Sequence, residues 1–202
     1  MNFLVVIVSY LLGSINFAYI TARIKGIDIS SEGSGNPGTS NILRTLGKGS
    51  AAIVLLGDLL KGAIPIIFFY QDQYFLVYGL AAVVGHIYPV FYKFKGGKGV
   101  ATYLGVYVAT VFMNPHNSDL FNIEIFQILN IPVLAFFYFV VFKTTRVSAI
   151  ASLATVLVTV SLLIYINNEI SNVVVLVVLF VLIFIKHSEN IKRLREGKEN
   201  KF

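Results

Sequence analysis

Cysteine is absent from the sequence, which excludes disulfide bonds, thiolate metal ligands and cysteine nucleophiles together. Charge is also scarce, because Asp, Glu, Lys and Arg make up only 13% of the 202 residues while hydrophobic residues make up 56%. A water-soluble chain carries about twice that share of charged residues. The composition therefore predicts an integral membrane protein.

The sequence also lacks the patterns of metal-dependent catalysis. It has three histidines, no H-E-x-x-H motif, and no aspartate cluster such as a two-metal site or a CDP-alcohol phosphotransferase needs. No order of Ser, His and Asp stands out, although sequence separation leaves a catalytic triad open. We therefore expect no metal and no cofactor, and a reaction that depends on positioning and electrostatics.

Seven apolar segments are present, and they predict an all-α integral membrane protein with seven transmembrane helices. The first segment lacks the basic start and the cleavage site of a signal peptide, so we expect a retained helix. The fourth is shorter than a usual span and would be tilted, partly re-entrant or extended by its neighbours. An arrangement of five helices would have to bury segments that hydropathy marks as spans. The segments cover residues 3–22, 50–70, 74–92, 99–113, 126–142, 148–165 and 172–185.

The basic residues predict the orientation in the membrane. Of the 16 Lys and Arg, 15 flank the first, third and fifth connections or lie in the C-terminal tail. Seven alternating helices place all of these on one side, which the positive-inside rule assigns to the cytoplasm. The N-terminus is then outside and the C-terminus cytoplasmic, and the net charge of +6 indicates anionic lipid rather than nucleic acid. We expect one polytopic membrane domain over residues 1–202, with cytoplasmic motif loops near 25–48, 93–99 and 186–202.

The sixteenth cation, Lys61, follows Asp58 within the second apolar segment, in "GDLLKG". Residues spaced i and i+3 share one helix face, so a buried ion pair is possible. Ionisable residues at membrane depth often serve function. An internal ion pair that fixes helix packing is the favoured alternative.

The first motif loop contains "GSGNPGTSN", residues 33–41, followed by Arg44. Glycines at 33, 35 and 38 allow successive backbone N–H groups to converge on an anion, and the guanidinium of Arg44 can hold a phosphate through two hydrogen bonds. A flexible polar linker is the alternative for this loop by itself.

Two further motifs favour a shared phosphate site. The segment "KFKGGKG" places Lys98 between glycines at the start of a helix, where an ammonium and backbone donors can meet an anion. An ordinary positive-inside loop is the alternative for this motif. His187 follows the last apolar segment; a solvated surface histidine is its alternative, and the remaining basic residues of the tail are typical of an amphipathic, lipid-facing segment.

The motifs taken together resemble the bacterial acyl-phosphate-dependent glycerol-3-phosphate acyltransferases, the PlsY family. The resemblance covers nearly the whole chain, in order. It implies a seven-helix enzyme of the bacterial inner membrane, with its active site facing the cytoplasm. The matching stretches are "GSINFAYITARIKGIDISSEGSGNPGTSNILRTLGK", "GDLLKG", "GHIYPVFYKFKGGKGVAT" and "HSENIKRLREGKENK".

The implied reaction transfers a fatty acyl group from acyl phosphate to the 1-hydroxyl of sn-glycerol 3-phosphate, giving lysophosphatidic acid and inorganic phosphate. This is the first acylation step of phospholipid synthesis. Glycerol 3-phosphate, long-chain acyl phosphate and membrane lipid are the implied partners, and the enzyme that makes acyl phosphate is a further candidate. No histidine is followed four residues later by Asp, the pair that thioester-dependent glycerol phosphate acyltransferases commonly carry.

The resemblance also implies roles for individual residues. The implied catalytic residues are Ser34, Arg44, Lys98 and His187. The implied substrate-binding residues are Gly33, Gly35, Asn36, Gly38, Thr39, Ser40, Asn41, Gly96, Gly97, Ser148 and Asn190. His86 and Pro89 also match, but a packed, hydrogen-bonded histidine explains His86 equally well.

Three departures from the family pattern concern the fine geometry of the donor side: Asn16 in place of proline, Thr39-Ser40 in place of Ala-Thr, and Ser188 in place of a basic residue. The residues leave two proton acceptors open, His187 and a substrate phosphate. A small anion transporter is the alternative of another class. Internal inverted repeats would favour it, and we find none.

Overall fold

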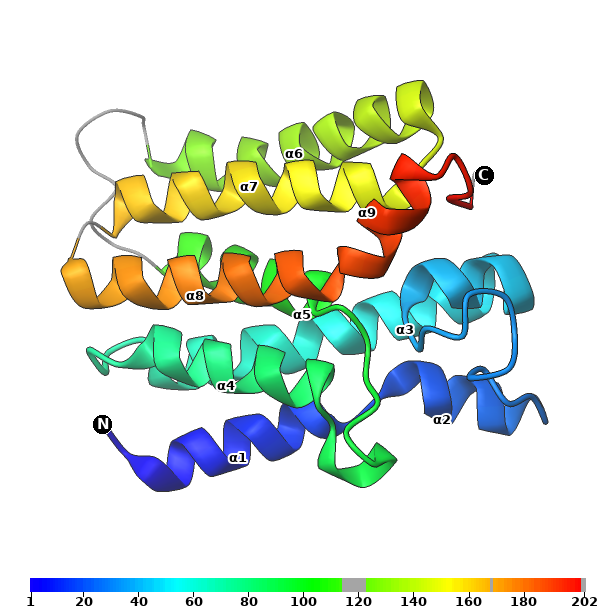
Figure 1. Cartoon of the computed structure of the whole chain (residues 1–202). Helices are drawn as coiled ribbons and strands as arrows, with labels where there is room; N and C mark the ends of the chain where they lie inside the picture. Colours follow the sequence, from blue (N-terminus) through cyan, green and yellow to red (C-terminus); the bar gives the residue numbers. More distant parts are fainter. Residues whose placement is uncertain (114–122, 168, 201–202) are drawn as a thin grey trace. The chain divides into compact units, whose positions relative to one another are not determined.

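The computed structural model describes residues 1–113, 123–167 and 169–200, and over these residues the chain is helical, with no strand (Figure 1). Lys201, which the sequence analysis placed in the basic tail, lies outside the described residues. The chain divides into two compact units, residues 1–106 and 107–202. The elements are α1 (Phe3–Ser14), α2 (Phe17–Ile24), α3 (Thr39–Phe69), α4 (Phe75–Ile87), the 3-10 helix η1 (Val90–Tyr92), α5 (Val100–Met113), α6 (Ile123–Thr145), α7 (Ser148–Ile166), α8 (Ile170–Lys186) and α9 (Ser188–Arg195).

In the first unit α4 packs against both α1 and α3, and α2 packs against α3 (Figure 1). Glycines bring α1 and α4 into backbone contact. A Cβ at Gly13 would lie 2.0 Å from the carbonyl oxygen of Ala82, and one at Gly85 would lie 2.2 Å from that of Tyr10. Small residues at such crossings allow close helix packing in membrane proteins. The same device joins α3 to α5, where Gly62 faces the backbone of Thr102.

The first apolar segment, predicted as a retained helix over 3–22, forms one candidate span, Phe3–Ile24, that is built from two helices rather than one. Ile15 and Asn16 are extended and separate α1 from α2. The side chain of Asn16 accepts a hydrogen bond from the backbone N–H of Tyr19, 3.1 Å away, and so caps α2. A capping asparagine therefore starts a new helix within the first apolar segment.

The first motif loop is shorter than predicted, because α3 already starts at Thr39. Residues 39–46 are helical rather than part of a loop over 25–48, and the bend that separates them from the apolar part of α3 falls at Gly47, with φ 78° and ψ −179°. A left-handed φ of this kind is open to glycine at no steric cost. Ser40, Asn41 and Arg44 therefore project from a helix of fixed geometry.

In the second unit α7 packs against α6 and α8, and α9 follows α8. Buried hydroxyls on α7 are satisfied within the helix, since Thr155 donates to the carbonyl oxygen of Ala151 and Thr159 to that of Thr155, both at 2.8 Å. Polar side chains inside an apolar bundle are stable only when they are paired in this way.

Within the part of the chain that the structure describes, four helical stretches are long and apolar enough to cross a membrane: Phe3–Ile24, Thr39–Phe69, Phe75–Tyr92 and Ser148–Ile166. A fifth is possible if Ile170–Lys186 and Ser188–Arg195, which meet at a bend of 49°, form one span. The apolar helices Val100–Met113 and Leu129–Thr145 are shorter. Large apolar side chains such as Phe3, Phe68, Phe136 and Ile170 are exposed, as on a surface that faces lipid.

Candidate active site

Asn41 holds the first loop, residues 25–38, against the start of α3. Its Oδ1 accepts a hydrogen bond from the N–H of Ser34 at 2.9 Å, and its Nδ2 donates to the carbonyl oxygen of Glu32 at 2.9 Å. Gly33 has φ +56°, and a Cβ there would lie 2.3 Å from Asn41 Oδ1. Only glycine fits this turn. The buried amide of Asn41, predicted to bind substrate, is thus engaged with the loop backbone on both of its ends.

The N-terminus of α3 presents polar groups beside this loop. Gly38 caps the helix without a side chain, so the first N–H groups of α3 have no side-chain cap from this position. The hydroxyl of Thr39 is buried and has no hydrogen-bond partner. An unsatisfied buried hydroxyl costs free energy unless something binds it. Together with the partly exposed Arg44 one turn further, this end of α3 suits an anion.

A carboxylate also lies in the first loop. Asp28 accepts hydrogen bonds from the hydroxyl of Ser30 at 2.7 Å and from its N–H at 3.0 Å. These bonds lower the pKa of the Asp28 carboxyl below its ordinary value. Asp28 therefore stays ionised and shapes the loop by accepting from its backbone.

The Lys98 loop, residues 93–99, lies directly against the first loop. A Cβ at Gly97 would be 3.2 Å from the carbonyl oxygen of Pro37. Lys98 lies near the start of α5, as predicted, and is separated from it by Gly99, which has a left-handed φ of +86°. The first unit thus brings together two of the three motif regions that the sequence analysis assigned to one phosphate site.

Contacts to α1 and α2 anchor the approach to the Lys98 loop. The hydroxyl of Tyr10 donates to the carbonyl oxygen of Tyr88 at 2.8 Å, and the ring of Tyr92 stacks on that of Tyr19 with centroids 4.7 Å apart. Lys93 and Phe94 then take left-handed φ angles of 52° and 59°. Such angles cost about 1–3 kcal/mol each for non-glycine residues and persist where surrounding contacts hold them. The loop conformation is therefore defined by its surroundings.

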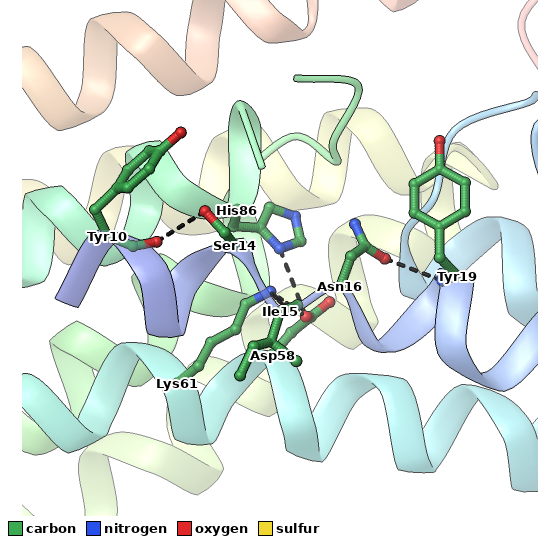
Figure 2. A network of polar contacts seen from close by, with 8 residues as sticks. All are labelled: Tyr10, Ser14, Ile15, Asn16, Tyr19, Asp58, Lys61 and His86. Atoms are coloured by element: carbon green, nitrogen blue, oxygen red, sulfur yellow. Dashed lines mark hydrogen bonds and ion pairs between the residues drawn. The ribbon is translucent and has the colours of Figure 1, made fainter. Parts of the chain in front are cut away.

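A buried charged cluster lies beneath these loops, made of Asp58, Lys61 and His86 (Figure 2). Lys61 Nζ is 2.8 Å from Asp58 Oδ1 and donates to the carbonyl oxygen of Ile15 at 2.7 Å. His86 Nδ1 is 3.5 Å from the same Asp58 oxygen. The predicted internal ion pair is confirmed, and His86 is packed beside it. Neither Asp58 Oδ1 nor His86 Nδ1 has a hydrogen-bond partner with suitable angles. The attraction of Asp58 to Lys61 and His86 is therefore chiefly electrostatic.

The sequence analysis missed the partners of this cluster. The carbonyl oxygen of Ile15 needs a donor because the helix breaks there, and Lys61 supplies it from α3. Asn16, noted in the sequence as a difference from the family pattern, lies at the helix break, but nothing in the sequence indicated that Lys61 would bind the freed carbonyl. The Tyr19–Tyr92 stack had no sequence signal beyond two aromatic residues near the motif loops.

The remaining predicted residues belong to the second unit. His187 joins α8 to α9 and is 2% exposed, so the alternative of a solvated histidine is wrong. Its Nδ1 lies 2.8 Å from the carbonyl oxygen of Ile183. Donation from Nδ1 assigns the proton of neutral His187 to that nitrogen and leaves Nε2 as the acceptor. Ser148 is the first residue of α7.

Asn190 lies on α9 and is held by a residue that the sequence analysis did not single out. Its Nδ2 donates to Glu199 Oε1 at 2.6 Å, and Arg193 Nε donates to Glu199 Oε2 at 2.8 Å. Asn190 Oδ1 is buried without a hydrogen-bond partner. The carboxylate of Glu199 therefore folds the tail back on α9, a role hidden in the sequence by the surrounding basic residues.

Among the described residues no group of three or more His, Asp or Glu side chains is placed to hold a metal ion. Apart from the carboxylates of Asp28 and Glu32, the polar groups of the two motif loops are backbone N–H groups, hydroxyls, an amide and cationic side chains. Such a set binds anions.

The whole chain is similar to proteins of one family. A family model described as glycerol-3-phosphate acyltransferase matches residues 3–197. Relatives named glycerol-3-phosphate acyltransferase include one from Wolbachia pipientis wMel, 38% identical and covering 100% of this chain and 98% of the relative. Another, from Aquifex aeolicus, is 39% identical and covers 98% of this chain and 97% of the relative.

Solved structures agree with this similarity. The crystal structure of PlsY (YgiH), described as an integral membrane glycerol 3-phosphate acyltransferase, matches in its glycerol 3-phosphate form with a TM-score of 0.81 and 36% identity, covering 99% of this chain and 94% of that one. Its lysophosphatidic acid form matches with a TM-score of 0.79. This chain is therefore a multi-pass integral membrane protein that belongs to the glycerol-3-phosphate acyltransferase family, in the PlsY group.

Proposed function

We propose that this acyltransferase uses acyl phosphate as donor and acylates the 1-hydroxyl of sn-glycerol 3-phosphate. The hydroxyl oxygen attacks the acyl carbon, the bond from that carbon to the phosphate oxygen breaks, and the hydroxyl proton passes to an acceptor. The products are lysophosphatidic acid and inorganic phosphate. The observation that carries the proposal is the contact between the two glycine-rich loops at Gly97 and Pro37.

This contact matters because the reaction brings two phosphate groups close together. Their repulsion must be offset by cations and N–H donors, which the N-terminus of α3, Arg44 and Lys98 can supply. In the proposal Ser34, Arg44, Lys98 and His187 are the catalytic residues, and the glycines and polar residues of the loops bind substrate. The glycerol 3-phosphate and lysophosphatidic acid forms of the PlsY crystal structure, at 36% identity, support this substrate and product.

The donor is inferred from the chemistry available. Acyl phosphate is a mixed anhydride with a good leaving group, so it needs positioning and oxyanion stabilisation more than it needs a strong base. A thioester would give the cationic loops no second phosphate at the reacting carbon. No histidine has an aspartate four residues later, so a His–Asp general base of the thioester-dependent kind is missing from the sequence.

Two proton acceptors fit the proposal. One is a phosphate of a substrate. The other is His187, whose Nδ1 contact to the carbonyl oxygen of Ile183 assigns the basic lone pair to Nε2. An acidic limb of the pH–rate profile that disappears in His187→Asn would assign the step to His187.

We further propose a single domain of seven spans in the bacterial inner membrane, with the N-terminus outside and the active site and C-terminus in the cytoplasm. The spans are α1 with α2, α3, α4 with η1, α5, α6, α7 and α8. The distribution of 15 of 16 Lys and Arg supports this orientation. The family match over residues 3–197 supports one domain.

A purified-enzyme assay tests the proposed donor. Detergent-purified protein without added metal should release inorganic phosphate and lysophosphatidic acid one for one from acyl phosphate and glycerol 3-phosphate, and EDTA should not change the rate. Acyl-CoA should give no product. Equal or faster turnover with acyl-CoA, or activity that EDTA abolishes and Mg²⁺ restores, would overturn the proposal.

A further inference from the structure

We propose that His86 is a positioning residue, held by Asp58 and Lys61, whose imidazole packs against Gly97 and so supports the Lys98 loop. The inference rests on the proposed function, because it assumes that Lys98 holds a substrate phosphate. It assigns a role to three buried residues that the transfer chemistry itself does not use.

The imidazole of His86 lies against Gly97. A Cβ at Gly97 would be 2.3 Å from His86 Nε2 and 2.9 Å from His86 Cε1. The N–H of Gly97 also donates to the carbonyl oxygen of His86 at 3.2 Å. His86 therefore meets the residue before Lys98 with both its ring and its backbone, and the ring occupies the space that any side chain at position 97 would need.

The ring is oriented from its other nitrogen. His86 Nδ1 faces Asp58 Oδ1 at 3.5 Å, and Asp58 is fixed in turn by Lys61 at 2.8 Å (Figure 2). Lys61 also donates to the carbonyl oxygen of Ile15, where α1 ends. The chain of contacts thus runs from the helix break in the first span through α3 and α4 to the Lys98 loop. All of its members lie in the first unit.

Burial makes these contacts sensitive to change. Asp58 and Lys61 are 1% exposed and His86 is 3% exposed. In so low a dielectric each charged or polar group depends on its neighbours, and a turn of the ring would take Nδ1 away from Asp58, which would keep only Lys61 as its partner. The hydrogen bond from Tyr10 to Tyr88 and the stacking of Tyr92 on Tyr19 hold the segment that leads into the Lys98 loop. His86 and Pro37 then define where Gly97 lies.

A displaced loop would move the ammonium of Lys98. Glycerol 3-phosphate binds chiefly through its phosphate, whereas acyl phosphate also buries its apolar chain. Loss of the His86 support should therefore raise the KM for glycerol 3-phosphate about tenfold, while the KM for acyl phosphate changes much less. A purely structural role would lower the amount of folded enzyme and leave the KM of the folded fraction unchanged.

The close approach of Gly97 allows a rescue experiment. Gly97→Ala should raise the KM for glycerol 3-phosphate about a hundredfold, more than loss of the His86 support alone, since the new methyl group overlaps the imidazole. Adding His86→Ala removes the obstructing ring and should lower that KM to about the level of His86→Ala alone. Gly96→Ala is the matched control. Its Cβ would lie 2.0 Å from the backbone oxygen of His86, so His86→Ala cannot relieve it.

A second set of variants separates positioning from folding. His86→Asn keeps an amide near the level of Nδ1, facing Asp58, but cannot reach Gly97. It should fold like the wild type by size-exclusion chromatography and still raise the KM for glycerol 3-phosphate. Tyr78→Phe, which removes a buried hydroxyl near the opposite end of α4, should alter thermal stability without changing either KM. If His86→Ala yields too little folded protein, the KM of His86→Asn for glycerol 3-phosphate tests the proposal.

An unchanged KM for glycerol 3-phosphate in folded His86→Asn, or the same KM in Gly97→Ala with and without His86→Ala, would overturn the inference. Failure of the proposed function gives another result. In that case the wild-type protein itself would not release phosphate from acyl phosphate in the presence of glycerol 3-phosphate.

Discussion

Asp58 and Lys61 show how a membrane span tolerates two charged residues. Their contact at 2.8 Å neutralises both charges, and the backbone oxygen of Ile15 accepts a further hydrogen bond from Lys61. A carbonyl freed by a helix break has no water to bind within the bilayer core. Lys61 therefore pairs with Asp58 and also supplies the donor that the carbonyl oxygen of Ile15 needs at the break in the first span.

We expect Asp58→Asn to lower the yield of folded protein, because breaking a buried ion pair costs about 3–5 kcal/mol. Asp58→Asn combined with Lys61→Met should recover part of that yield, since no unpaired charge remains. Fluorescence-detected size-exclusion chromatography of detergent extracts measures both. A wild-type profile for the Asp58→Asn protein would show that Lys61 does not depend on this partner.

Arg44 and Lys98 carry the cationic part of the proposed site. We expect Arg44→Ala and Lys98→Ala each to fold normally and to lose about ten- to 150-fold in kcat/KM, the equivalent of a charge-assisted hydrogen bond of about 1.5–3 kcal/mol. Lys95→Ala, exposed in the same loop, is the matched control and should retain most activity. Near-wild-type turnover in both Arg44→Ala and Lys98→Ala would refute the assignment of the phosphate site.

At the scale of the helix, glycine decides how closely α3 and α5 approach. A Cβ at Gly62 would lie 1.9 Å from the carbonyl oxygen of Thr102, and one at Gly105 would lie 1.9 Å from that of Leu59. The two helices thus touch through their backbones from both sides. This close packing places α5, and with it the end of the Lys98 loop, against the span that carries Asp58 and Lys61.

Gly62→Ala should lower the thermal unfolding temperature in detergent, because the added methyl forces the backbones apart at a cost of about 1–3 kcal/mol. Gly49→Ala in the same helix is the control. A Cβ there meets nothing within 4 Å, and replacing a helical glycine by alanine gains up to about 1 kcal/mol. Equal stability of the two variants would contradict the close contact of α3 with α5.

At the scale of the whole molecule, the proposed alternation of seven spans can be tested directly, because the protein has no cysteine of its own. Single cysteines at Ser31, Thr144 and Ser188 should react with an impermeant thiol reagent only from the cytoplasm, and one at Gln73 only from outside. Asn117 and Asn168, also expected outside, lie beyond the described residues. Labelling of positions 31 and 73 from the same side would break the alternation.

The sequence by itself determined the membrane class, the helical architecture and the family. The scarcity of charge and the apolar segments follow from composition, which requires no knowledge of which helices touch. The resemblance was also sufficient to predict glycerol-3-phosphate acyl transfer. Two helix boundaries were not predicted from the sequence. The cap at Asn16 falls inside a continuous apolar run, and the bend at Gly47 falls inside a polar run, so neither coincides with a change in composition.

Only the tertiary structure decided the partners of the buried polar residues. Lys61 meets the carbonyl oxygen of Ile15 across 46 positions of the chain, and the ring of His86 reaches both Asp58 and Gly97. Spacing along a helix could predict the Asp58–Lys61 pair, since both lie on one face. Contacts between different helices depend on how glycine crossings bring backbones together, and no periodicity in the sequence carries that information.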